Sequence, residues 1–256
     1  MPLLNARELR AGYGSLEVLH GVDFYTDRGE LVVVMGPNGA GKSTLLGSLA
    51  RAVRTFSGEI TFKGESILSL RTSDVARNGM AFVPQDGNVF TDLSVRENLS
   101  LAASASGSSR RALHSGGFAD SVFDHFPFLR KLENRPAGLL SGGERQALAL
   151  SMGFLQRPSI MLLDEPTAGL SPLAAENLGA WILELAAQGL AIVWVVEQDP
   201  EVVLKVATRA YLLDGGYVRF SGDAQELVGG KGAELLFQPQ QVFQPQRIAT
   251  TEGTVQ

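Results

Sequence analysis

The sequence predicts an α/β fold in which a parallel sheet is interrupted by a helical insertion. A glycine-rich loop at residues 36–43 follows the apolar, β-branched run 31–35 and precedes a helical pattern. The runs 160–163 and 190–196 are also continuously apolar, as is typical of strands buried on both faces of a parallel sheet. Between residues 91 and 156 helical periodicity replaces the strand pattern, which predicts an inserted helical subdomain.

The composition limits the class of protein. The chain has 256 residues, enough to bury a large core, and 22 basic against 27 acidic side chains give a net charge of −5. An acidic chain has no general attraction for nucleic acid, and the absence of cysteine excludes disulfides and thiolate metal sites. No signal peptide is evident and the apolar runs are too short to cross a bilayer, so we expect a soluble chain.

The first 35 residues alternate short apolar runs with turns. We expect strands at 16–25 and 31–35, joined by a turn at 27–29. Tyr13 lies in a glycine-containing turn after an earlier strand. The ring of Tyr13 can stack on a nucleobase, or Tyr13 is an ordinary surface tyrosine. The sequence is compatible with both interpretations.

The glycine-rich loop has the pattern G-x-x-x-x-G-K-[ST] in the strand–loop–helix context that phosphate binding requires. Glycines let the backbone N–H groups point inward, and the helix N-terminus adds its positive dipole end. Lys42 can reach the β- and γ-phosphates, and the Ser43 hydroxyl can hold Mg²⁺. The residues expected to surround the phosphates are Gly36, Pro37, Asn38, Gly39, Ala40, Gly41, Lys42, Ser43 and Thr44.

The helix after this loop is expected to end near residues 51–54, and strands are expected at 58–62 and 79–84. Gln85 directly follows the second of these strands. In α/β proteins a polar side chain at the carboxyl end of a strand lies where ligands bind. A solvated loop glutamine fits the same position equally well.

The helical block contains two capping patterns. Ser94 and Glu97 form a capping box before a helix through 98–101, whereas the Ser-, Ala- and Gly-rich segment 102–117 predicts a surface loop. Its pair Arg110-Arg111 has no aromatic neighbours and does not predict a nucleic-acid patch.

The second capping box, Ser141 with Glu144, opens another helix, and Gly142 and Gly143 leave backbone N–H groups exposed at its start. This is a second potential anion site. One chain has no evident use for two phosphate cradles on separate subdomains. Two chains that face each other would use both, with each presenting this helix end to the nucleotide held by the other. The alternative is a plain helix cap.

Two carboxylates, Asp164 and Glu165, end the apolar strand 160–163. Adjacent acids at a strand end are costly unless a cation or phosphate chemistry is present. The alternative is that they are solvated charges at the end of the strand. Asp164 can hold Mg²⁺ through water, and Glu165 is then free to polarise an attacking water as a general base.

Ser171 is expected to cap the next helix, with Pro172 at its first position. One face of this helix is apolar and predicts core packing; its members are Ala174, Leu178, Trp181, Ile182 and Leu185. Gln198 follows the strand 190–196. It can hydrogen-bond a γ-phosphate or the attacking water, or it is a loop glutamine.

Strands at 210–213 and 217–220 are expected to form a hairpin around Asp214-Gly215-Gly216. The repeated Phe-Gln-Pro-Gln and polar composition predict a disordered tail at 238–256, with a docking role as the alternative.

Taken in this order, the motifs over residues 1–237 resemble the ATP-binding cassette of ABC transporters. The resemblance implies a P-loop NTPase fold with a RecA-like mixed sheet core, an antiparallel β subdomain and a helical subdomain at about 88–157. It also implies roles for single residues. Tyr13 would stack on adenine, and Gln85 would contact the metal and link it to the helical subdomain. Leu140 to Gln146 would form the signature, with Ser141 to Glu144 at the nucleotide. Asp164 would be the Walker B aspartate, Glu165 the catalytic glutamate and Gln198 the switch residue.

Two positions depart from the usual family pattern. Gln198 stands where the switch is usually His, and Ser171 stands where the D-loop usually has Asp. With the segment 90–99, these departures resemble the ATPases of branched-chain amino-acid importers, or of the related urea importers.

The resemblance implies an ATPase that uses ATP and Mg²⁺ in a head-to-tail dimer, peripheral on the cytoplasmic face of the membrane. Its partners would be multi-span permease subunits, a second ABC ATPase or a copy of itself, and indirectly a substrate-binding protein, with no nucleic acid. The alternatives are an exporter ATPase, such as one for lipopolysaccharide, a soluble cassette ATPase of translation or DNA repair, and a P-loop kinase. The kinase alternative does not account for the signature.

Overall fold

A computed structural model describes residues 1–105, 118–196 and 200–229. Within these ranges a six-stranded sheet has the order β10-β9-β3-β8-β7-β6. All neighbouring strands are parallel except the β9–β10 hairpin, which is antiparallel. The strands are β3 (Leu31–Met35), β6 (Met80–Val83), β7 (Ile160–Asp164), β8 (Ala191–Val195), β9 (Arg209–Asp214) and β10 (Tyr217–Asp223).

This sheet is buried on both faces, which explains its continuous apolar runs. Because side chains alternate along a strand, Val32 and Val34 of β3 join the core on one face, and Val33 joins the core on the other. The same alternation separates Leu162 from Met161 on β7. The predicted strands 31–35 and 160–163 are therefore confirmed as the centre of the fold.

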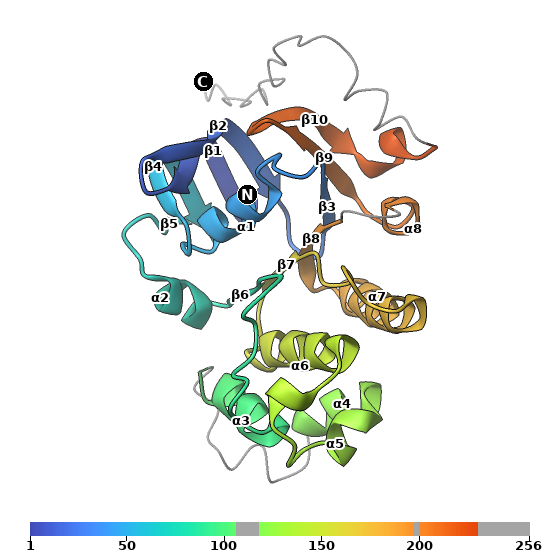
Figure 1. Ribbon diagram of the computed structural model, residues 1–256. Helices are drawn as coiled ribbons and strands as arrows, with labels where there is room; N and C mark the ends of the chain where they lie inside the picture. The colour runs from blue at the N-terminus through green and yellow to red at the C-terminus, as the bar shows by residue number, and fades with distance from the viewer. Residues whose placement is uncertain (106–117, 197–199, 230–256) are drawn as a thin grey trace, which may run out of the picture.

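A smaller antiparallel sheet has the order β2-β1-β4-β5. Its strands are β1 (Leu4–Tyr13), β2 (Leu16–Thr26), β4 (Arg54–Phe62) and β5 (Glu65–Ser66). Helix α1 (Lys42–Leu49) contacts β1, β2 and β4 as well as β7, so it lies between the two sheets (Figure 1). The mixed sheet, the antiparallel sheet and the added helices confirm the predicted α/β P-loop fold class.

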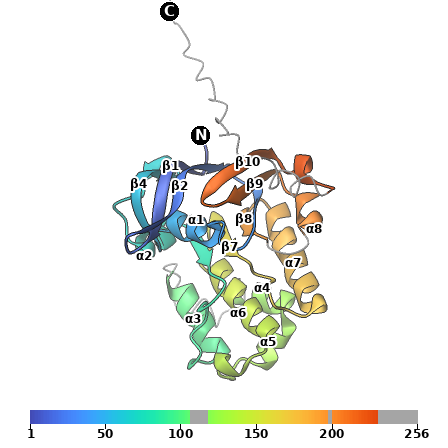
Figure 2. The same cartoon turned by 45° about the horizontal axis from the view of Figure 1, so that its top comes forward.

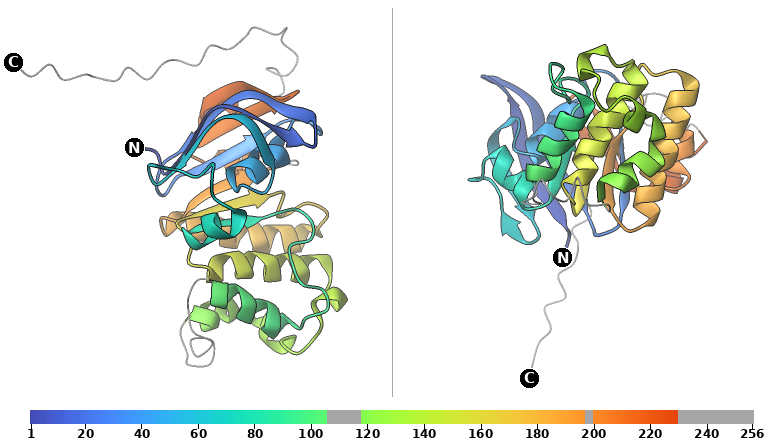
Figure 3. Two further views of the ribbon diagram at one scale, coloured as in Figure 1. Left: turned by 90° about the vertical axis from the view of Figure 1, so that its left-hand side faces the viewer. Right: turned by 90° about the horizontal axis from the view of Figure 1, so that it is seen from below.

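Helices gather at the opposite end of the molecule from the antiparallel sheet (Figures 1 and 2). They are α3 (Val95–Ala105), α4 (Phe118–His125), α5 (Pro127–Lys131), α6 (Gly142–Leu155) and, beside the sheet, α7 (Pro172–Ala187). Figure 3 shows α3 and α6 side by side, and the two helices are in contact. The shorter helices are α2 (Thr72–Arg77) and α8 (Glu201–Leu204), with 3-10 turns at Ala137–Leu139 and Ala224–Leu227.

Both predicted capping boxes form, as does the predicted cap of α7. The Ser94 N–H donates to the Glu97 carboxylate at 2.8 Å, and at α6 the Ser141 N–H donates to Glu144 at the same distance. The Ser171 hydroxyl accepts from the N–H of Ala174 at 3.4 Å. These contacts satisfy N–H groups that a helix start otherwise leaves without partners.

Two local predictions are wrong. Residues 51–54 do not end the first helix, because α1 stops at Leu49 and Arg51 takes a left-handed φ of 61°. Arg54 already begins β4, where it pairs with Gly12 of β1. Residues 102–105 are not loop: they form the last turn of α3, and Ala102 and Ala103 are buried. Small side chains pack there, and this burial outweighs the weak local preference for a loop.

Residues 106–117, the predicted tail at 238–256 and Gln198 lie outside the described residues. In the part of the chain that the structure describes, no helix is both long enough and apolar enough to cross a bilayer.

Candidate functional site

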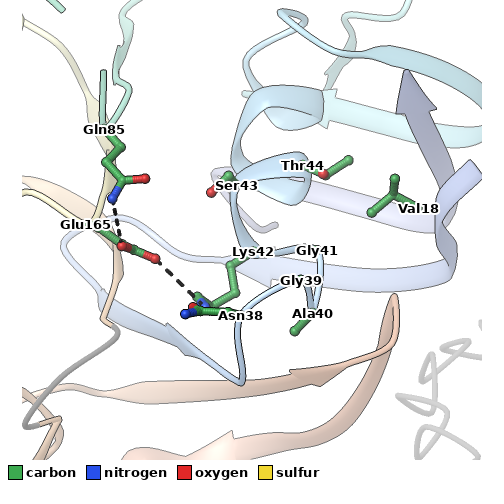
Figure 4. A pocket seen from close by; sticks show the side chains of 10 residues that line it. All are labelled: Val18, Asn38, Gly39, Ala40, Gly41, Lys42, Ser43, Thr44, Gln85 and Glu165. Carbon is green, nitrogen blue, oxygen red and sulfur yellow. Dashed lines mark hydrogen bonds and ion pairs between the residues drawn. The ribbon is translucent and has the colours of Figure 1, made fainter. Parts of the chain in front are cut away.

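A pocket of about 420 Å³ opens at the carboxyl ends of β3, β6 and β7 (Figure 4). Parallel α/β sheets place their ligand sites at this edge. The lining comes from segments far apart in the sequence: Val18, Asn38, Gly39, Ala40, Gly41, Lys42, Ser43, Thr44, Gln85 and Glu165. Most of the predicted phosphate loop, Gln85 and Glu165 therefore meet in one place.

Lys42 is 5% exposed and supplies the positive charge of this pocket. Its Nζ donates to the carbonyl oxygens of Gly36 at 2.9 Å and Pro37 at 3.2 Å, and lies 3.8 Å from Glu165 Oε1. A buried ammonium has three donors to satisfy, and weak carbonyl partners leave it available for a stronger anionic acceptor. The arrangement can bind phosphate oxygens at the mouth of the loop.

Gly36 shows why the loop requires glycine. Its φ is 148°, and a Cβ atom at this position would lie 2.1 Å from the carbonyl oxygen of Leu213 in β9. Such a distance is far inside van der Waals contact with backbone that cannot rotate away. The first residue of the loop therefore packs directly against the backbone of β9. The local motif does not predict this contact.

Asp164 forms a hydrogen bond with Ser43, which lines the pocket. The Ser43 hydroxyl donates to Asp164 Oδ1 at 3.0 Å, and the aspartate is only 4% exposed. Burial raises the pKa of the Asp164 carboxyl group, while the Ser43 hydrogen bond and the Lys42 charge act in the opposite direction. A hydroxyl and a buried carboxylate are hard oxygen donors of the type that Mg²⁺ prefers together with phosphate and water.

We expect Asp164→Asn to raise the urea midpoint of unfolding of the nucleotide-free chain. A carboxyl group whose pKa is raised by folding disfavours the folded state when ionised at neutral pH, and this penalty disappears as the pH falls through the folded-state pKa. Asparagine keeps an oxygen for Ser43 but carries no charge. The control is Asp92→Asn at an exposed site, where no change is expected. A lower midpoint for Asp164→Asn would contradict a net burial cost at this carboxylate.

Glu165 is directed into the pocket by its backbone and by two neighbours (Figure 4). Its φ of 49° is in the left-handed region, which costs a residue with a side chain about 1–2 kcal/mol. Gln85 Nε2 donates to Glu165 Oε2 at 3.0 Å, and Lys42 lies beside the other oxygen. A strained, 9%-exposed carboxylate held in this way is suited to act on a water next to bound phosphate.

Other predicted residues lie away from this pocket within one chain. Tyr13 ends β1 with 54% of its surface exposed. Ser141 and Gly142 are also exposed at the start of α6, and none of the segment Ser141 to Glu144 lines the pocket. Tyr13 and the start of α6 are therefore accessible for contacts outside this pocket.

Sequence reasoning missed Val18 and Asn88 as site residues, and it named Gln146 only as the end of the signature. Val18 of β2 lines the pocket, but one valine in an alternating strand gives no signal of a site. Asn88 Nδ2 donates to Gln146 Oε1 of α6 at 2.9 Å and so ties the segment after Gln85 to that helix. Gln146 is buried in α6. The one signal in the sequence that could have identified the pair is a glutamine directly before the run Ala147 to Leu150.

Comparison with known proteins decides the family. Residues 19–168 match the ABC transporter family. The chain belongs to the ABC transporter family. This ABC ATPase has relatives that align over almost their whole length, so its ATP-binding and ATP-hydrolysing class is established.

Two relatives show the closeness of the match. A probable branched-chain amino acid transport ATP-binding protein LivF of Archaeoglobus fulgidus is 39% identical, over 91% of this chain and 98% of the relative. The high-affinity branched-chain amino acid transport ATP-binding protein BraG of Pseudomonas aeruginosa is 34% identical, over 93% and 96%. A solved ATP-binding subunit of an ABC transporter superposes with a TM-score of 0.78 at 28% identity, covering 91% of this ABC ATPase and 98% of that chain.

Proposed function

We propose that this ABC ATPase energises an importer for branched-chain or other hydrophobic amino acids. One observation supports ATP hydrolysis by this site: Glu165 lies in the phosphate pocket between Gln85 and Lys42. The two branched-chain amino acid relatives support the cargo class, since they align over nearly the full length of both chains.

In the proposed reaction the phosphate loop and Lys42 bind the phosphates of ATP. Ser43 and, through water, Asp164 would hold Mg²⁺, which would neutralise part of the negative charge of the phosphates. Glu165 accepts a proton from the attacking water, and Gln198 orients that water. Tyr13 stacks on the adenine ring, as its exposure at the end of β1 permits.

A head-to-tail dimer would complete each site. Ser141 and Gly143 of one chain would approach the γ-phosphate held by the other, with the open N–H groups of α6 directed at the anion. Ser141 is exposed and does not line the pocket of its own chain, which supports this arrangement. The second chain is a sister ATPase or a copy of this chain, on the cytoplasmic face of the membrane beside multi-span permease subunits and, indirectly, a substrate-binding protein.

Gln198→Ala is expected to lower turnover about tenfold, less than removal of the general base. The glutamine orients water but takes no proton, so its loss removes one hydrogen bond rather than the chemical step. Steady-state phosphate release at saturating ATP measures this effect. A loss as large as that of Glu165→Gln would show that Gln198 carries more of the chemistry than assigned.

The assembly is tested by pulling down the tagged chain from detergent-solubilised membranes and identifying the bound proteins by mass. Two multi-span proteins with a second, similar ATPase would support the heteromeric importer. Recovery of copies of this chain alone, or of ribosomal proteins, would overturn it while leaving the ATPase assignment intact.

The cargo is tested by uptake of labelled leucine and urea in cells with and without this chain. Loss of leucine uptake alone supports the proposal, and loss of urea uptake alone would move it to the urea importers. Unchanged uptake of both, with accumulation of an exported lipid, would favour an exporter. A phosphorylated small molecule in place of free phosphate would indicate a kinase.

A further inference from the structure

The β9–β10 hairpin touches the phosphate loop at both ends, although it comes more than 150 residues later in the chain. At one end, the carbonyl of Leu213 occupies the space that a side chain at Gly36 would need. At the other end, the Gly216 N–H donates to the carbonyl of Ala40 at 3.0 Å. Figure 4 shows the pale orange hairpin beneath the loop that carries Ala40.

The same hairpin is bound to β2 of the antiparallel sheet. The Gly216 carbonyl accepts from the His20 N–H at 3.0 Å. Deeper in the fold, the Tyr211 hydroxyl of β9 accepts from the Tyr25 N–H at 2.9 Å and donates to the Tyr25 carbonyl at 3.1 Å. Because Val18 of β2 lines the pocket, the hairpin joins the phosphate end of the site to the strand on its other wall.

Aromatic and ionic contacts support the tip of the hairpin. The rings of Tyr217 and His20 lie 5.0 Å apart, and His20 Nδ1 lies 2.9 Å from Glu17 Oε1. At the base of the turn, Arg219 pairs with Asp214 at 3.1 Å. The turn is thus held in one position relative to both the loop and β2.

We propose that Gly216 is a positioning residue for the phosphate loop, through which the β9–β10 hairpin sets the affinity of this ABC ATPase for nucleotide. Its N–H and C=O groups bridge Ala40 and His20 at the same time. These two hydrogen bonds position the phosphate loop and make no contact with the reacting water. Gly216 therefore governs the binding of ATP and ADP alike and leaves the chemical step to Glu165.

Neighbouring Gly215 provides a matched control. Both glycines have positive φ, 54° at Gly215 and 81° at Gly216. Gly215 is exposed, and a Cβ atom there would meet nothing within 4 Å. A Cβ atom at buried Gly216 would lie 2.0 Å from the carbonyl oxygen of Val18, so the turn must move relative to β2, and the Gly216 N–H that donates to Ala40 moves with it.

The experiment measures equilibrium binding of trinitrophenyl-ATP to the full chain, with ATP and ADP as competitors, and steady-state hydrolysis. For Gly216→Ala we expect the Kd of both nucleotides and the KM to rise about tenfold, because a buried loop carbonyl loses its donor. The kcat at saturating ATP should stay within about twofold. Gly215→Ala also places a side chain at positive φ, but without a clash, and should bind within about twofold of the unsubstituted chain.

A second pair of variants keeps the test informative if Gly216→Ala does not fold. Tyr217→Ala removes the ring that stacks on His20 and should raise the Kd about threefold, whereas Tyr217→Phe keeps the ring and should not. Unchanged binding in Gly216→Ala, or in Tyr217→Ala, would overturn the proposal. So would an equal loss in Gly215→Ala, or a fall in kcat at constant KM.

Discussion

Glu165→Gln is expected to reduce ATP turnover by about 10²–10⁴-fold, the range over which a positioned general base contributes. The glutamine side chain has nearly the same shape and keeps an oxygen that can accept from Gln85, which donates to Glu165 at 3.0 Å. It cannot take a proton from water at neutral pH. The pocket therefore remains formed while the chemical step is lost.

ATP binding should be retained in Glu165→Gln, and two measurements separate it from turnover. Equilibrium binding of trinitrophenyl-ATP reports the affinity, and single-turnover phosphate release reports the chemical step. Removing the carboxylate frees Lys42, 3.8 Å away, for the phosphates, so the affinity should be unchanged or higher. The control is Glu176→Gln at an exposed position of α7, with turnover as in the unsubstituted chain. Turnover within a few-fold in Glu165→Gln would rule out its role as the base.

Lys42→Met should weaken nucleotide binding by about 100-fold or more. Hydrogen bonds to charged groups each contribute about 1.5–3 kcal/mol, and two of them to phosphate oxygens amount to this factor. Methionine keeps much of the length of the buried side chain, so the loop stays packed. The loss also leaves Glu165 without its adjacent positive charge, which adds repulsion between the carboxylate and the phosphates.

The same binding assay measures this loss, and thermal unfolding without nucleotide checks that the chain remains folded. Lys205→Ala, which removes an exposed lysine far along the sequence, is the control and should bind normally. Affinity within about threefold in Lys42→Met would mean that the backbone N–H groups of the loop bind the phosphates without help from Lys42.

Several features of this ABC ATPase are determined by neighbouring residues and could therefore be predicted from the sequence. The strand, glycine loop and helix around Lys42 are contiguous, and each capping box spans a single helical turn. The central strands could be identified because burial on both faces requires an unbroken apolar run. The predicted loop at the last turn of α3 was wrong because burial of Ala102 and Ala103 outweighed a weak local preference. The predicted helix end near Arg51 was wrong because Arg51 takes a left-handed φ that already leaves the helix.

Contacts across long sequence separations were decided only by the tertiary structure. Ser43 and Asp164 are 121 residues apart, and Gln85 and Glu165 are 80 apart, yet each pair forms a hydrogen bond at the site. The resemblance named these residues, but the parallel order of β3, β6 and β7 brings them to one edge. The contact of Gly216 with Ala40 had no sequence signal at all. Its cause is the antiparallel turn of β9 and β10 beside β3, a spatial arrangement that no local pattern encodes.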